Sequence, residues 1–129
     1  MAVVLWSVTR GRNGTGAGPV LTQPATSAQY VQAQVYATLA GAVYSPVNDT
    51  VQVAFVPQPA TGPPPNPASG QFNAAYWQTD STGPTAVYWA SCMVGPGGVV
   101  LAAGAYATAW QVTDSPTVPV LWGPVLLIT

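Results

Sequence analysis

The chain has 129 residues, of which 49% are hydrophobic and only 4% are charged, and its formal net charge is −1. This length fits one domain with a hydrophobic core of its own. The chain has no His, Lys or Glu, so it lacks most of the side chains that serve as general acids, general bases and metal ligands. We therefore expect no enzyme, with no catalytic residues, no metal and no cofactor. Nucleic acid is excluded as a partner because phosphate binding relies on clustered Lys and Arg, and the chain has only two arginines.

The scarcity of charge also bears on assembly. Few charges give little repulsion between copies, so a free, concentrated monomer would have poor colloidal stability, and we expect a protein that functions in an assembly. Cys92, the single cysteine, stands in VYWASCMV and is expected to be a small buried hydrophobe. The N-terminal apolar run precedes the positive charges and is too short to cross a bilayer, which predicts neither a secretory signal nor a membrane anchor.

Residues 2–8 form a short apolar run, and the glycine-rich stretch GRNGTGAGP follows it. This composition predicts an extended N-terminal arm over residues 1–28, ahead of a β-sandwich domain over 29–129. The arm would lay Val4, Trp6 and Val8 on a neighbouring subunit. A disordered tail or a first edge strand is equally consistent with this segment.

From Tyr30 the sequence alternates between polar or aromatic residues and small apolar ones, which is typical of a half-buried strand. Further strands are predicted over 50–56, 72–79 and 86–94. Between the first two lies PQPATGPPPNPASG, residues 57–70, which predicts an exposed loop with polyproline character because proline lacks the N–H that a central strand needs. Proline-rich ligands of recognition domains usually carry flanking basic residues, and none occur here, so a loop or inter-subunit spacer is favoured.

Residues 97–112, GGVVLAAGAYATAWQV, contain two apolar runs joined through residues 103–105, and we expect a β-hairpin. In the second run Tyr106, Thr108 and Trp110 fall on one face, and alanines fall on the other. The spacing Leu101-x-x-Gly104-x-Tyr106 resembles the tyrosine corner of immunoglobulin-like sandwiches, in which the hydroxyl bonds to the backbone just upstream; an ordinary hairpin that contains a tyrosine is the alternative. The last run, 118–129, is interrupted by Pro119 and Pro124, which predicts a sheet edge or a bulge.

No segment shows a sustained helical period, so almost no helix is expected. About seven strands separated by Gly/Pro turns predict an all-β fold, an immunoglobulin-like antiparallel β-sandwich of about seven strands with an extended N-terminal arm. Trp77 or Trp89 would occupy the place of the core tryptophan. The usual cystine is absent, as is common in cytosolic and virion sandwiches.

Two further sets of side chains bear on function. Asp49, Asp80 and Asp114 stand in turn-like settings, where Asp bonds to nearby backbone amides, and nothing in the sequence places two of them together. Stacking aromatics with amides beside them are one way in which β-sandwiches hold sugars, and the same residue types equally form a dry subunit interface. The candidate exposed aromatic face consists of Tyr30, Gln32, Gln34 and Tyr36.

Turn and strand motifs between residue 43 and the C-terminus carry a resemblance to a known class of proteins. They are Pro46-x-x-Asp49-Thr50-Val51, Val94-Gly95-Pro96-Gly97-Gly98, Gly104-x-Tyr106, Asp114-x-Pro116-x-x-Pro119-Val120 and Gly123-x-x-Leu126-x-Ile128. This set resembles the immunoglobulin-like structural proteins of tailed bacteriophages that infect high-GC actinobacteria. Thr117, where an acidic residue is expected after the proline, departs from the pattern.

The resemblance implies a virion structural protein. The foremost expectation is a capsid decoration or minor capsid protein, made in the host cytoplasm, which binds the outer surface of the major capsid shell and stabilises it. A tail or baseplate component is the alternative within the same class, and a carbohydrate-binding β-sandwich module is the alternative from another class. The expected partners are the major capsid protein or copies of the chain itself, with weak glycan contact and no membrane or nucleic acid. The residues expected to contact the capsid are Val4, Trp6, Val8, Arg10 and Arg12.

Overall fold

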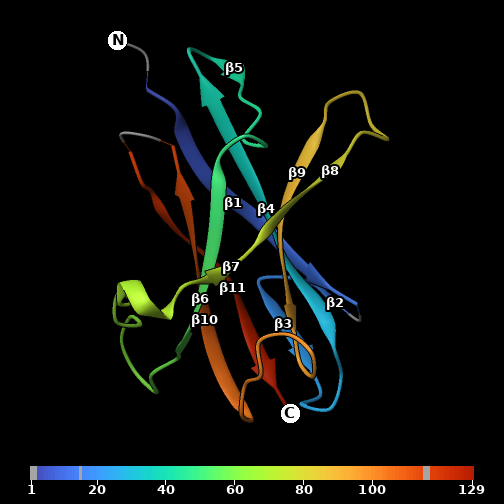
Figure 1. Ribbon diagram of the computed structural model, residues 1–129, viewed down its shortest axis with the longest axis vertical. Coiled ribbons are helices and arrows are strands. Elements are labelled where there is room, and N and C mark those ends of the chain that lie inside the picture. Colours follow the sequence, from blue (N-terminus) through green and yellow to red (C-terminus); the bar gives the residue numbers. More distant parts are fainter. Residues whose placement is uncertain (1–2, 15, 115–116) are drawn as a thin grey trace.

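The computed structural model describes residues 3–14, 16–114 and 117–129. Within them the chain forms a β-sandwich of two sheets, with one short 3-10 helix, η1 (Ser69–Gln71), and no α-helix (Figure 1). In spatial order the first sheet contains β2 (Gly16–Gly18), β1 (Leu5–Asn13), β4 (Gln29–Leu39), β9 (Val87–Val94) and β8 (Tyr76–Asp80), with β5 (Ala42–Val43) paired to the end of β4. The second sheet contains β3 (Val20–Gln23), β11 (Val120–Ile128), β10 (Gly104–Thr113), β6 (Thr50–Pro57) and β7 (Asn73–Ala74).

These strand orders are those of an immunoglobulin-like sandwich. β1, β4, β9 and β8 take the places of strands A, B, E and D, and β6, β10 and β11 take the places of C, F and G. The strand pairs are antiparallel except for β3 with β11. The predicted all-β sandwich is therefore confirmed. The described residues contain eleven strands rather than about seven, because β2, β3, β5 and β7 are short pieces of two to four residues at the sheet margins.

The core lies between the two sheets and follows the alternation of the longer strands. On β4, Val31, Ala33 and Val35 point inward, and Tyr30 and Tyr36 point outward, as the sequence predicts. Cys92 of β9 belongs to the same core and is a free, buried thiol. Burial raises the pKa of this thiol to about 11, so it stays protonated at neutral pH and packs as the small hydrophobe that was expected.

The N-terminal segment differs from the expected arm because it is built into both sheets. β1 pairs with β4 from Leu5 opposite Thr38 to Arg12 opposite Gln32, and β3 pairs with β11. Trp6 and Val8 pack against the sandwich core, so they are not available to a neighbouring subunit. The apolar face of β1 closes a core that would otherwise be open at this side, and the glycines allow the chain to pass from one sheet to the other. Residue 28 therefore does not separate an arm from a domain; Met1, Ala2 and Thr15 lie outside the described residues.

The hairpin predicted over 97–112 is wrong. Only its second run is a strand, β10, and residues 95–103 carry the chain from β9 in the first sheet to β10 in the second. Val99 makes only an isolated bridge to Val94. β10 already has β6 on one side and β11 on the other, so neither of its edges is left to pair with the first run.

The single strand predicted over 72–79 is also corrected, because the structure divides it into two strands in different sheets. β7 pairs with β6 of the second sheet, and β8 pairs with β9 of the first.

The core tryptophan is Trp110 of β10, and the expectation of Trp77 or Trp89 is corrected. Trp110 is completely buried, and its indole Nε1 donates a hydrogen bond to Thr108 Oγ1 at 3.0 Å. The Thr108 hydroxyl in turn donates to the carbonyl of Pro124 at 2.7 Å. A bulge lies at this point, because Ala107 pairs with Val125 and Ala109 with Trp122, so β11 has two residues opposite one of β10. Pro124 is therefore accommodated in a bulge, as the sequence predicts.

Tyr106, near the start of β10, forms the backbone bond that a tyrosine corner requires. Its hydroxyl donates to the carbonyl of Ala102 at 2.8 Å, and its ring is half-buried against the core rather than fully buried. We expect Tyr106→Phe to lower the free energy of unfolding by about 1 kcal/mol, the usual net contribution of one such bond. Urea denaturation followed by circular dichroism measures this loss. Tyr36→Phe, which alters an outward-facing ring, is the matched control and should be neutral; equal stability of the two variants would contradict the corner.

Candidate functional site

The outer face of the first sheet is polar and aromatic. β4, β8 and β9 lie side by side there, with Gln32 opposite Ser91, Gln34 opposite Trp89, and Trp89 opposite Gln78. Because these positions share the outward phase of their strands, they form one continuous surface, which we name the tyrosine–glutamine face. Its residues are Tyr30, Gln32, Gln34, Tyr36, Tyr76, Gln78, Trp89 and Ser91.

Both arginines of the chain lie on this face. A bulge between Val8 and Arg10 shifts the phase of β1 by one residue, so Arg10 comes opposite Gln34 and Arg12 opposite Gln32. Arg10 Nε donates to Gln34 Oε1 at 2.6 Å, and Arg12 Nε donates to Gln32 Oε1 at 2.5 Å. The two guanidinium carbons lie 5.5 Å and 3.8 Å from the centre of the Trp89 ring, within the range of cation–π attraction. This cover explains why Trp89 is only 3% exposed although it points away from the core.

Gln32 is the centre of the hydrogen-bond network on this face. Its oxygen accepts from Arg12, and its Nε2 donates to Gln78 Oε1 at 2.5 Å and to Ser91 Oγ at 3.3 Å. The network thus ties together β1, β4, β8 and β9. Above it lies a hollow of about 540 Å³, lined by Arg12, Tyr30 and Gln78 among others, and a second of about 340 Å³ between Tyr30 and Tyr76.

The outer face of the second sheet is uncharged and mostly apolar, with Gln52 and Gln111 among its outward positions. Ala54, Val56 and Ala109 form a small cluster on it, which Phe72 covers. The outward positions of β3, β6, β10 and β11 and the loop over 58–68 include no charged residue. The large hydrophobic side chains that remain exposed on this sheet are Val20, Val120, Trp122 and Leu127.

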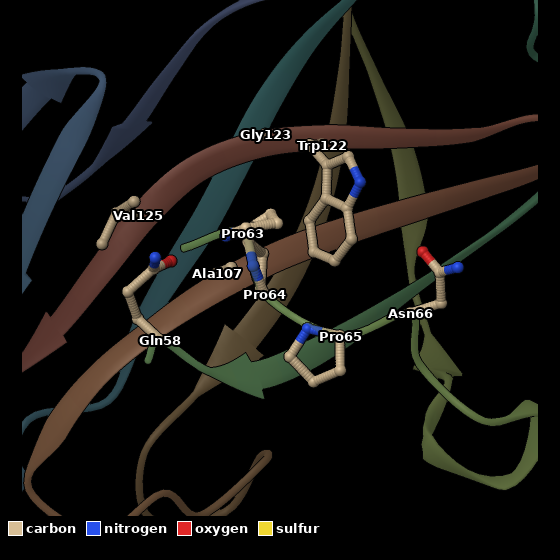
Figure 2. Close-up of a pocket in the computed structure, with 9 residues that line it drawn as sticks. All are labelled: Gln58, Pro63, Pro64, Pro65, Asn66, Ala107, Trp122, Gly123 and Val125. Atoms are coloured by element: carbon tan, nitrogen blue, oxygen red, sulfur yellow. The ribbon is translucent and has the colours of Figure 1, made fainter. Parts of the chain in front are cut away.

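A groove of about 630 Å³ lies between this apolar face and the proline-rich loop. Figure 2 shows the indole of Trp122 reaching from β11 over the proline segment, with Gln58 and Val125 toward one end and Asn66 at the other. Trp122, which lines the groove, is 40% exposed. We name this site the proline–tryptophan groove; its lining residues are Gln58, Pro63, Pro64, Pro65, Asn66, Ala107, Trp122, Gly123 and Val125.

The residues expected to contact the capsid are not gathered in one surface. Trp6 and Val8 face the core, and Val4 is half-buried just before β1. Arg10 and Arg12 instead join Tyr30 and Tyr36 on the opposite face of the same sheet. The sequence analysis missed this grouping because the bulge in β1 leaves no mark in the residue pattern. It also missed the groove, which needs the loop after β6 to fold over β11.

The three aspartates lie at strand ends, as their turn-like settings predict. Asp80 accepts hydrogen bonds from the backbone N–H and hydroxyl of Thr82. Thr50 pairs with Thr113, which brings Asp49 and Asp114 to neighbouring positions at one end of the second sheet, a juxtaposition that the sequence did not reveal. Asp49 Oδ2 accepts from the Tyr44 hydroxyl at 3.1 Å. Burial and the charge of Asp114 raise the pKa of Asp49, while the bond from Tyr44 acts in the opposite direction.

These environments predict opposite pH effects for two aspartates. A raised pKa of Asp49 means that the folded state holds the proton more tightly than the unfolded chain, so the stability it contributes is present at low pH and is lost as pH rises above about 4. We expect Asp49→Asn to gain stability relative to the parent between pH 3 and pH 6. Asp80, whose pKa the Thr82 bonds lower, should behave oppositely, with Asp80→Asn losing stability over the same interval. Urea unfolding across this pH range measures both, and parallel pH profiles of the two variants would contradict the assignment.

No family model, curated protein or solved structure matches this chain. The protein is therefore classified by its fold alone, as an immunoglobulin-like sandwich whose two outer faces differ in composition. No group of three His, Cys, Asp or Glu side chains that could hold a metal ion occurs among the described residues. In the same part of the chain, no helix has the length and apolar character needed to cross a membrane.

Proposed function

We propose that this chain is a structural protein of a tailed-bacteriophage virion, without enzymatic activity. In this role it is a capsid decoration or minor capsid protein, which binds the outer surface of the major capsid shell in many copies and stabilises it. The observation that carries the proposal is the uncharged outer face of the second sheet, on which Val20, Val120, Trp122 and Leu127 are exposed. The resemblance of the turn and strand motifs to immunoglobulin-like phage proteins supports the choice of particle.

The distribution of charge favours attachment through this face. Arg10, Arg12 and Asp80 lie on the first sheet, and Asp49 and Asp114 lie at one end of the sandwich. A partner that covers the outer face of the second sheet around Trp122, away from the end that carries Asp49 and Asp114, would therefore desolvate no charged group. Desolvation of charge is the costly step in forming many interfaces.

The proline–tryptophan groove provides the anchor of the proposed contact. Tryptophan is enriched among the residues that dominate binding energy at interfaces. Proline has a fixed φ angle, so a loop that contains Pro63, Pro64 and Pro65 loses little conformational freedom when a partner orders it. We therefore place the capsid contact at this groove rather than at residues 2–12, because Trp6 and Val8 are occupied by the core.

The test uses particles of the phage that encodes the chain, produced without it and then incubated with purified protein. Trp122→Ser should reduce the affinity for the particle by about 30-fold, a typical loss for an interface tryptophan. Tyr36→Ser, which changes an exposed aromatic residue on the opposite sheet, is the matched control and should bind fully. Deletion of residues 1–18 is not a useful variant, because it removes β1 and opens the core.

Imaging of the reconstituted particle distinguishes the two virion locations. Density on the head shell, with Trp122 at the contact, supports the proposal. Density on the tail or baseplate would assign the chain to the alternative within the same class. Undiminished binding of Trp122→Ser, or absence of the chain from particles, would overturn the proposed attachment.

A further inference from the structure

We propose that the tyrosine–glutamine face is a binding site for an acidic oligosaccharide. Sugar rings would stack on Tyr30 and Tyr76, and a sugar carboxylate would lie against Arg12 and Arg10. This inference does not depend on the virion role, since it concerns the opposite sheet and is testable on the isolated chain.

The shape of the face suits an extended polar ligand. The two hollows above the Gln32 network share Tyr30 and Gln78 as lining residues, so they adjoin, with Arg12 on the first and Tyr76 on the second. We name the pair the groove of this face. Their volumes, about 540 and 340 Å³, fall within the usual range for small-molecule sites. Tyr30 is 55% and Tyr76 is 67% exposed, so both rings present area to a ligand rather than to the protein.

The side chains of the groove match the surface of a sugar. A pyranose has apolar C–H faces and a rim of hydroxyl groups, and tyrosine likewise combines an apolar ring with a polar tip. Gln78 uses its oxygen to accept from Gln32, which leaves its NH₂ group as a donor for a ligand hydroxyl. Gln32 is fixed by its bonds to Arg12, Gln78 and Ser91, so the floor of the groove needs little reordering on binding.

The arginines add a requirement for negative charge. Arg10 and Arg12 are the only Lys or Arg residues of the chain, and the partners recorded for their guanidinium groups are neutral, namely the amide oxygens of Gln34 and Gln32 and the ring of Trp89. Each arginine donates its Nε–H to a glutamine, so its terminal nitrogens (Nη1 and Nη2) can still donate a bidentate pair of hydrogen bonds to a carboxylate. Asp80 is the carboxylate that interacts with the charge of Arg12, which lowers the pKa of Asp80 by less than the two hydrogen bonds from Thr82 do. Asp80 Oδ1 already accepts those two bonds from Thr82.

These features together favour an acidic glycan over other anions. A nucleic acid strand carries phosphates along its whole length and needs more than two cations in a protein of net charge −1. A uronic acid oligomer instead offers a stacking ring, hydroxyl groups and one carboxylate per sugar. These correspond to the tyrosines and glutamines of the groove, to Arg12 at its end, and to Arg10, which lies beside the groove over the same Trp89 ring.

The experiment titrates the full chain with trigalacturonate and trimannuronate by calorimetry, each compared with its methyl ester, which keeps the rings and removes the charge. At least one acid should bind, its ester should bind at least tenfold more weakly, and rising salt should weaken the acid alone. Arg12→Gln should lower affinity for the acid about tenfold more than affinity for the ester, because the ester loses only the bond that fixes Gln32. Tyr76→Ala should weaken both to a similar extent. Circular dichroism verifies that each variant is folded, and Arg10→Gln provides a second charge variant.

Trp122→Ala, on the other sheet, is the matched control and should bind the acid like the parent chain. Failure of both acids to bind at millimolar concentration would overturn the proposal, as would equal affinity for acid and ester. Unchanged binding by Tyr76→Ala would do the same. None of these results would affect particle attachment through Trp122, so the two proposals fail separately.

Discussion

Replacement of Trp110 by alanine is expected to lower the free energy of unfolding by about 3–5 kcal/mol, the usual cost of deleting a large buried aromatic side chain. The indole is completely buried between the sheets and donates a bond to Thr108. The cavity cannot close easily, because Trp110 belongs to β10, which is paired with β6 on one side and β11 on the other. Since single domains are stable by only about 5–15 kcal/mol, the variant should lose a large share of the stability of the domain.

Trp122→Ala provides the matched control, because Trp122 lies on the neighbouring strand but points outward and is 40% exposed. We expect it to cost less than about 1 kcal/mol. Circular dichroism under urea measures both variants without relying on tryptophan fluorescence. Trp110→Phe should fall between the two, since it keeps an aromatic ring but lacks the N–H that reaches Thr108. A Trp110→Ala variant as stable as Trp122→Ala would contradict the assignment of Trp110 as the core tryptophan.

The second large effect is expected at Gly95, where the chain turns away from β9. Its φ angle is +115°, and a Cβ atom there would lie 2.0 Å from the carbonyl oxygen of Ser27. That oxygen also accepts a hydrogen bond from the buried Gln23 side chain. Gly95→Ala must therefore combine backbone strain of about 1–2 kcal/mol with displacement of the segment at Ser27 and weakening of a buried bond, for a total of about 3 kcal/mol or more.

Gly97→Ala measures the cost of backbone strain without a steric contact. Gly97 also has a positive φ angle, +87°, but a Cβ atom there would meet nothing within 4 Å. We expect it to cost about 1 kcal/mol, so the difference between the two alanine variants in thermal or urea unfolding reports the contact with Ser27. If the two alanine variants lose similar free energies of unfolding, the turn around Gly95 shifts to make room for the added Cβ atom, and the predicted contact with Ser27 is contradicted.

The strand pattern of β4 shows how far the sequence could predict the fold. Val31 and Ala33 are buried and Tyr30 is exposed because side chains alternate across a strand, and that rule is local. The exposed aromatic face and the bulge at Pro124 follow from equally local reasoning. The predicted hairpin was wrong because the first apolar run looks like a strand, whereas the pairing of β10 with both β6 and β11 leaves it no partner.

The candidate sites depend more strongly on contacts between distant segments. The sequence identified Tyr30, Gln32, Gln34 and Tyr36 as a surface, but the arginines join it only through the bulge in β1. The proline-rich loop was recognised, yet the groove beneath it requires Trp122, which lies more than fifty residues further along the chain.

By itself, the sequence determined the sandwich class and the inward and outward phases of the long strands. It also showed the scarcity of charge, which favours association with other protein chains. These follow from local alternation and composition. Only the tertiary structure decided that the N-terminal segment is part of the sheets, that Trp110 fills the core, and that one outer face is apolar while the other carries both arginines. Those outcomes depend on which strands pair and where a bulge shifts the phase, and both are set by packing between segments far apart in the chain.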